Sequence, residues 1–131
     1  MQHRNGPLAW VARKAKFVPL SSCEIEVFGV MMLLKEAEFA SQVIEFLDGP
    51  LQQKTAAITD NKSARDVIKC PGATKRTVHF DRWLHFAREL VLMNKAEVFF
   101  TPTDDMMADS FTKAVDKTKF LKCRDYIMAS V

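Results

Sequence analysis

Residues 55–67 read TAAITDNKSARDV, a short apolar run followed directly by a polar stretch. Its first five residues, TAAIT, have the length and composition of a short buried strand. The apolar run stops at Asp60, and a polar segment that can begin a helix follows at once. Sheets of α/β proteins present ligands outside the carboxyl ends of their strands. Asp60 is therefore either a ligand-binding carboxylate or the N-cap of the next helix.

The length and composition of the chain indicate one domain over residues 1–131. Its 131 residues, 48% of them hydrophobic, are enough for a single core. No apolar run approaches the roughly 20 residues that a membrane helix needs, and the polar N-terminus does not resemble a secretory signal. We therefore expect a soluble intracellular protein without a membrane partner. Cys23, Cys70 and Cys123 are far apart in the sequence and predict free thiols.

The order of the expected elements predicts an α/β fold with a partly parallel sheet. The expected strands are residues 8–20, 55–59 and 97–100. The expected helices cover about 23–47, 63–69, 78–94 and 117–128, with a further helix after 103–105 that contains Asp109. Three strands are fewer than the five or six of a typical sheet, so we expect the sheet to be incomplete.

Glu26 continues the apolar seam of the first expected helix. This seam steps by three and four residues, as a buried stripe does, through Val30, Leu33, Ala37, Ala40, Ile44 and Leu47. One turn before Val30 the seam reaches Glu26, whereas Glu24 is expected to point elsewhere. A buried carboxylate needs a cation, a metal or hydrogen-bond donors. The alternative is that Glu26 lies at the rim of the core and is solvated.

Asp109 is the third carboxylate of interest, after Glu26 and Asp60. It lies too far into its expected helix to interact with the first-turn dipole, which Asp104 and Asp105 complement. The alternative is an ordinary exposed helical carboxylate. Taken together, the three acids could hold two divalent cations in a site that cleaves phosphodiesters.

Basic residues are concentrated in the middle of the chain, although the net charge is only +3. Between residues 62 and 95, eight lysines and arginines face three carboxylates. Such a segment can bind the phosphates of a polyanion, or it can be the solvated face of helices. The candidate nucleic-acid contacts are Lys62, Arg76, Arg82 and Arg88.

Four ordered blocks resemble the RNase H domain of copia-type LTR retrotransposon polyproteins. The first is VPLSSCEIEVFG (18–29), similar to the family's L-S-S-x-E-A-E-Y, and the second is ITDNKSA (58–64), similar to Y-C-D-N-Q-S-A. The third is KRTVHFDRWLHFAREL (75–90), similar to R-T-K-H-I-D-I-R-Y-H-F-I-R-E-L. The fourth is FTPTDDMMADSFTKA (100–114), similar to V-P-T-E-D-Q-L-A-D-I-F-T-K-A, and KFLKCRDYI (119–127) is similar to the family's closing F-x-x-L-R-D.

This resemblance implies an RNase H-like mixed sheet flanked by helices, and hydrolysis of the RNA strand of RNA/DNA hybrids with two Mg²⁺ ions. By motif, Glu26, Asp60 and Asp109 match three of the family's four acidic positions. The fourth belongs to a first strand in a segment like Y-S-D-A-D-W, which has no counterpart in these residues. Residues 6–18 match the third strand of the fold, so the first two strands are expected to be missing.

The incomplete set of acids predicts that the chain alone is a weak or inactive nuclease. The implied partners are an RNA/DNA hybrid and the upstream reverse transcriptase part of the polyprotein, in a cytoplasmic virus-like particle or the nucleus. An exposed sheet edge could also allow self-association. The alternative is a non-catalytic remnant of the fold that binds nucleic acid or another protein.

Overall fold

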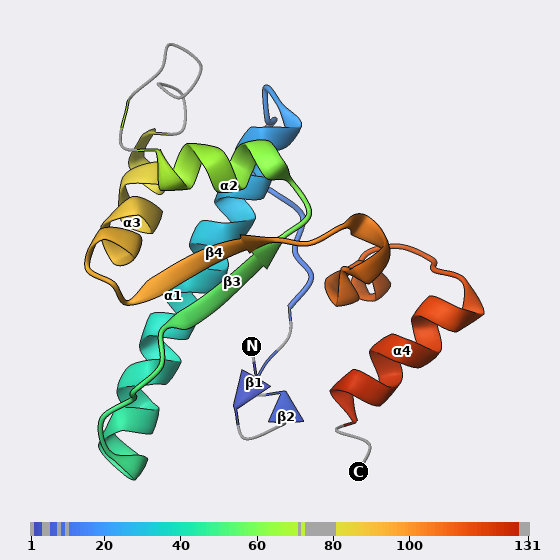
Figure 1. Ribbon diagram of the computed structural model, residues 1–131. Helices are drawn as coiled ribbons and strands as arrows, with labels where there is room; N and C mark the ends of the chain where they lie inside the picture. The colour runs from blue at the N-terminus through green and yellow to red at the C-terminus, as the bar shows by residue number, and fades with distance from the viewer. Residues whose placement is uncertain are drawn as a thin grey trace. The chain divides into compact units, whose positions relative to one another are not determined.

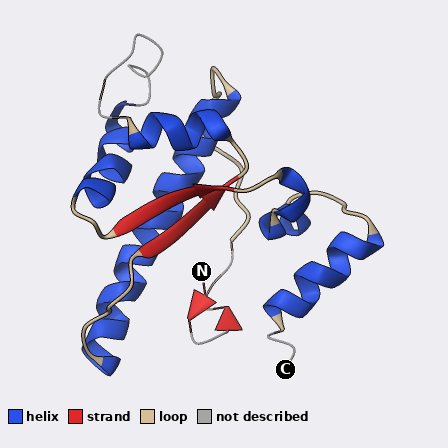
Figure 2. Ribbon diagram, viewed as in Figure 1, coloured by secondary structure: helices blue, strands red, loops and turns tan. Residues whose placement is uncertain are grey.

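The computed structural model describes residues 2–3, 6–7, 9, 11–70, 72 and 81–128, with only the backbone described at 2–3 and 6–7. These residues form a mixed α/β structure with four α-helices and a two-stranded parallel sheet (Figures 1 and 2). The chain divides into two compact units. We call Phe17–Thr101 the sheet unit and Met1–Lys16 with Pro102–Val131 the terminal unit, and we describe each by itself.

The sheet unit begins with the long helix α1 (Ser22–Asp48). Ser21 is its N-cap and accepts the backbone N–H of Glu24, whose carboxylate in turn accepts the N–H of Leu20 at 2.7 Å. This reciprocal arrangement satisfies two backbone donors at the helix start. The helix ends at Gly49, which has φ +88° and so occupies a conformation that disfavours side chains. The predicted end at Asp48-Gly49-Pro50 is confirmed.

The two strands β3 (Thr55–Thr59) and β4 (Ala96–Phe100) pair in parallel, with Thr55 opposite Ala96 and Thr59 opposite Phe100. Helices α2 (Lys62–Lys69) and α3 (Asp81–Leu92) connect them. The predicted order of strand, two helices and parallel strand is therefore confirmed. The finer prediction, an RNase H-like sheet, is not decided by a two-stranded sheet alone.

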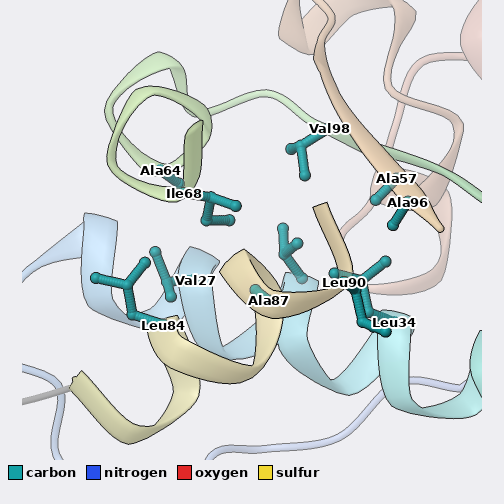
Figure 3. Packing of buried hydrophobic residues seen from close by; sticks show 11 residues of the cluster. Val27, Leu34, Ala57, Ala64, Ile68, Leu84, Ala87, Leu90, Ala96 and Val98 are labelled. Carbon is teal, nitrogen blue, oxygen red and sulfur yellow. The ribbon is translucent and has the colours of Figure 1, made fainter. Parts of the chain in front are cut away.

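One face of the sheet packs against all three helices of the unit. Side chains alternate along a strand, so Ala57, Thr59, Ala96 and Val98 point inward while Ile58 and Phe99 lie on the exposed face. Figure 3 shows Ala57, Ala96 and Val98 of the strands facing apolar side chains of α1, α2 and α3. The helix residues of this core are Val27, Val30, Leu34, Ala64, Ile68, Leu84, Ala87 and Leu90.

The buried seam of α1 differs from the predicted one. It runs through Val27, Val30, Leu34 and Ala37, and Glu24 instead of Glu26 is the buried carboxylate near its start. Beyond Ala37 the seam is no longer fully buried. The reason is length, because 27 helical residues span about 40 Å and a five-residue strand only about 17 Å. The C-terminal half of α1 extends past the strands (Figure 1).

The terminal unit contains a short antiparallel pair, β1 (Gln2–His3) and β2 (Gly6–Pro7). It also contains two 3₁₀ helices, η2 (Thr103–Asp105) and η3 (Met107–Phe111), and the helix α4 (Lys117–Ile127). The expected helix around Asp109 is thus a 3₁₀ helix. Helix α4 packs against η3, and Cys123 is buried there, within 3.3 Å of the Met107 carbonyl.

The strand predicted at residues 8–20 is wrong where the structure describes it. Residues 11–20 form no strand, and Val11, Val18 and Leu20 are exposed. β-branched residues favour a strand only where a neighbouring strand and a packed face receive them. Phe17 has ring contacts with Phe28 and Trp83 at 5.1 and 4.7 Å.

Two simpler expectations can be compared directly with the structure. All three cysteines are free thiols, as predicted. Among the described residues, no helix has the length and apolar character needed to cross a bilayer. The prediction of a single domain over residues 1–131 depends on how the two units are arranged and stays a prediction.

Leu34→Ala and Leu47→Ala make the same change at two positions of α1. Leu34 is 1% exposed and Leu47 is 71% exposed. We expect Leu34→Ala to lower the free energy of unfolding by about 2–5 kcal/mol and Leu47→Ala by less than about 0.5 kcal/mol. Urea denaturation followed by circular dichroism measures both. Equal losses would contradict the packing described for α1.

Candidate functional site

The carboxylate of Glu26 meets the carboxyl end of strand β3. The Thr59 hydroxyl, on a residue only 2% exposed, donates to Glu26 Oε2 at 3.2 Å. The same hydroxyl accepts the backbone N–H of Asn61, also at 3.2 Å. Thr59 therefore links the first turns of α1 to the turn between β3 and α2. Glu26 is half-buried, between the inward and solvated positions considered from the sequence.

Asp60 follows Thr59 directly and is not the cap of helix α2. The N-cap is Asn61, whose side-chain oxygen accepts the N–H of Ala64 at 3.0 Å. The alternative that Asp60 serves as a helix cap is thus wrong. Asp60 is half-buried at the end of β3, next in sequence to the residue that binds Glu26. These two acids supply carboxylate oxygens, which are possible metal ligands, near the carboxyl end of β3.

The thiol of Cys23 lies close enough to Glu26 to respond to its charge. Burial of Cys23 raises the pKa of its thiol, and the negative charge of Glu26 raises it further. Both effects favour the protonated thiol. Cys23 is therefore a half-buried neighbour of Glu26 and not a reactive thiolate.

Asp109 lies in the terminal unit and is held by two lysines. Its carboxylate, 13% exposed, is 2.9 Å from Lys113 Nζ and 3.0 Å from Lys119 Nζ. Lys119 also donates to the carbonyl of Thr103, so it ties α4 to both 3₁₀ helices. Burial raises the pKa of Asp109, but hydrogen bonds and charges from both lysines outweigh burial and lower it overall. Asp109 is thus a paired, ionised carboxylate, and the exposed alternative is wrong.

Two of the three predicted acids, Glu26 and Asp60, belong to the sheet unit, whereas Asp109 belongs to the terminal unit. Glu26 accepts from Thr59, the residue before Asp60. Within either unit, the described residues contain no group of three or more His, Cys, Asp or Glu side chains able to hold a metal ion. Convergence of all three acids on Mg²⁺ stays a prediction.

The four predicted nucleic-acid contacts differ in their surroundings. Lys62 is exposed at the start of α2, with its Nζ 5.6 Å from the ring centroid of Phe100. Arg82 is exposed on α3, and Arg76 lies outside the described residues. Arg88 is 8% exposed. Only Lys62 and Arg82 therefore present their charge on the described surface.

Arg88 instead joins α3 to the end of α2. Its guanidinium donates twice to the Val67 carbonyl, at 3.2 and 2.8 Å, and once to the Gly72 carbonyl at 3.0 Å. Such carbonyls have no helical partner at the C-terminal end of a helix. The signal in the sequence was its position between Ala87 and Leu90 on the apolar side of α3. Its assignment as a phosphate contact stays a prediction, because it first serves the backbone.

Sequence comparison relates the chain to transposon polyproteins. It is 30% identical over 122 residues to the retrovirus-related Pol polyprotein from transposon TNT 1-94 of Nicotiana tabacum, which covers 93% of this chain and 9% of that protein. It is 28% and 27% identical, each over 114 residues and 87% of the chain, to the corresponding polyproteins from transposons RE1 and RE2 of Arabidopsis thaliana.

The chain therefore spans less than a tenth of the length of these relatives, 9% of the first and 8% of the other two. No protein-family profile matches it. No solved structure matches it with significance. The relationship supports a region of a retrotransposon polyprotein and does not identify which activity of the polyprotein that region has.

Thr59→Val and Thr55→Val test the link through Thr59. Valine keeps the shape of threonine but removes the hydroxyl, which leaves Glu26 without this donor and the Asn61 N–H without this acceptor. We expect Thr59→Val to lower the free energy of unfolding by about 1–3 kcal/mol. Thr55→Val, at the other end of β3, should change it by less than about 0.5 kcal/mol. A Thr59→Val chain as stable as the wild type in chemical denaturation would show that the hydroxyl contributes nothing.

Asp109→Asn should destabilise the chain in a pH-dependent way. Because the pKa of Asp109 is lowered in the folded chain, its stabilising effect is fully present above the unfolded pKa of about 4. It is lost as pH falls through the lower folded pKa. We expect Asp109→Asn to cost about 1–3 kcal/mol at pH 7, with the difference from wild type shrinking below about pH 4. Denaturation curves over this pH range measure it. Asp104→Asn, an exposed neighbour, is the control, and an equal loss there would contradict the role of the lysine pair.

Proposed function

We propose that the chain is the RNase H-like region of a copia-type retrotransposon Pol polyprotein. In the polyprotein it would hydrolyse the RNA strand of an RNA/DNA hybrid. Similarity to Pol polyproteins over most of the chain supports the setting. The observation that carries the proposal is the hydrogen bond from Thr59 to Glu26, which holds one carboxylate beside the residue preceding Asp60.

The donors around β3 suit a hard divalent cation. Mg²⁺ prefers carboxylate oxygens as ligands. Near the carboxyl end of β3, the described carboxylates are those of Glu26 and Asp60, both half-buried. A pair of such ions would activate the attacking water and stabilise the leaving oxygen of a phosphodiester. Glu26 and Asp60 would hold the metals and orient the scissile phosphate.

The set of acids in the sequence is one short of the family's four. Residues resembling the first-strand segment Y-S-D-A-D-W do not occur in these 131 residues. In two-metal sites, ligands that bridge both ions fix the distance between them. We therefore propose that the chain alone binds metal weakly and has little or no nuclease activity.

Glu26→Gln and Asp60→Asn test the metal site directly. Calorimetric titration with Mg²⁺ should give weak binding by the chain, lowered at least about tenfold by either substitution, because each removes one anionic ligand. Glu45→Gln, an exposed position on the same helix, is the control and should leave binding unchanged.

Cleavage of a labelled RNA/DNA hybrid completes this test. We expect little or no turnover by the chain in Mg²⁺. Robust turnover that disappears in Asp60→Asn would contradict the proposal that the chain alone is inactive. The same result would support the proposal that the region is a nuclease. Metal binding that neither Glu26→Gln nor Asp60→Asn reduces would overturn the proposal as a whole.

The second candidate is a non-catalytic nucleic-acid-binding region. Exposed Lys62 and Arg82 in the sheet unit favour it. The two candidates differ in selectivity, which binding to RNA/DNA hybrid, duplex RNA and heparin at increasing salt would measure. A preference for hybrid supports an RNase H-like region, whereas equal and salt-sensitive binding to all three supports electrostatic binding alone.

A further inference from the structure

Three cations of helix α2 lie against two phenylalanines of strand β4. Lys62 Nζ and Arg65 Cζ are 5.6 and 5.9 Å from the ring centroid of Phe100, and Lys69 Nζ is 5.7 Å from that of Phe99. The cations are three and four residues apart, so they share one side of the helix. We call these five residues the basic–aromatic ridge.

The ridge is on the surface of the sheet unit. Lys62 and Lys69 are exposed, and the Phe99 residue is 43% exposed on the uncovered face of the sheet. A cation near an aromatic face is attracted to it, which holds the long side chain beside the ring. The ridge thus presents positive charge and aromatic surface together.

Carboxylates neutralise this charge only in part. Arg65 is paired with Asp66 at 2.6 Å, and Lys69 is 3.9 Å from Glu97, the outer limit of an ion pair. Three cations against two carboxylates leave a positive surplus. Both pairs are on the surface, where an incoming phosphate can exchange for a carboxylate at little cost.

The ridge also has a direction. It begins at Lys62, two residues after Asp60, and follows α2 away from the end of β3. From Lys62 to Lys69 the helix rises by about 10 Å, the length of about three nucleotides in a stacked strand. A strand passing the Glu26 and Asp60 carboxylates could continue directly along it.

We propose that the basic–aromatic ridge binds single-stranded nucleic acid. Lys62, Arg65 and Lys69 contact successive phosphates, and an unpaired base stacks on Phe99. A single strand fits better than a duplex, because bases in a duplex are already stacked on one another, whereas unpaired bases stack readily on exposed aromatic rings. This site adds to the proposed nuclease function and does not depend on metal binding or hydrolysis.

Fluorescence anisotropy with a labelled oligothymidine of about 12 nucleotides tests the ridge. We expect Phe99→Ala to weaken binding about tenfold, whereas Phe99→Tyr, which keeps the ring, retains it. The double variant Lys62→Gln/Lys69→Gln should weaken binding and reduce the slope of log affinity against log salt by about 1.4.

Matched controls lie on α4. Lys117→Gln/Lys122→Gln removes the same charge from exposed positions, and Phe120→Ala removes an exposed ring. We expect both to bind oligothymidine within about twofold of the wild type. Circular dichroism of each variant confirms that it is folded. Losses of oligothymidine affinity as large as those of the ridge variants would show that binding does not depend on the position of these residues, and would overturn the proposal.

Two further results would also overturn it. One is the absence of measurable oligothymidine binding at low salt, and the other is duplex RNA binding as tight as that of oligothymidine. Asp60→Asn separates this proposal from the nuclease function, because it removes a metal ligand but should retain oligothymidine binding. Failure of metal binding with intact oligothymidine binding would therefore leave the ridge supported and the nuclease rejected.

Discussion

The hydroxyl of Thr59 is the contact on which the arrangement of the sheet unit depends. It is almost completely buried, donates to Glu26 and accepts from Asn61. A buried hydroxyl is costly unless it is hydrogen-bonded, and here it is bonded in both directions. The start of α1, the end of β3 and the start of α2 thereby meet at one side chain. That meeting point holds Glu26 and Asp60 at the same edge of the sheet.

The apolar contacts explain why this edge is stable despite so small a sheet. A parallel pair of five-residue strands has little stability alone and must be covered. Helices α1, α2 and α3 cover one face, with Val27, Leu84 and Val98 completely buried between them. The other face carries Ile58 and Phe99 toward solvent. The contact between Thr59 and Glu26 lies on the covered side. In the basic–aromatic ridge, Phe99 lies on the exposed face, whereas Phe100 alternates with it and is half-buried beside α2.

Local signals in the sequence predicted where helices and strands begin and end better than they predicted which elements pack together. Gly49 ended α1 as expected, because a glycine after the last helical turn accepts a positive φ. The prediction of a strand at 8–20 is wrong over residues 11–20, since no strand among the described residues pairs with this segment, and periodicity cannot reveal whether a partner exists. The seam of α1 was predicted through Leu47 because a repeat shows which side is apolar and not how far the sheet reaches.

The candidate site shows the same division between residue type and partner. The sequence located Glu26 and Asp60 at the helix start and the strand end. It could not show that Thr59 connects them, because a threonine at the end of a strand is ordinary. Nor could it show that Asp109 pairs with Lys113 and Lys119, since ten residues separate it from Lys119. Patterns along the chain identify acids, whereas only the fold shows which cations and donors each acid meets.

Asn61 determines where helix α2 begins, and so how the candidate metal ligands lie relative to the basic–aromatic ridge. Because the side chain of Asn61 caps α2, the carboxylate of Asp60 does not serve as the cap, and Asp60 directly follows the end of β3. The cap also fixes where α2 begins, and therefore where Lys62 stands relative to Asp60. Cations that follow a carboxylate pair so closely draw a polyanion toward it while leaving the acids to bind metal. Metal-dependent chemistry and strand binding would thus be aligned by one helix start, with separate residues responsible for each.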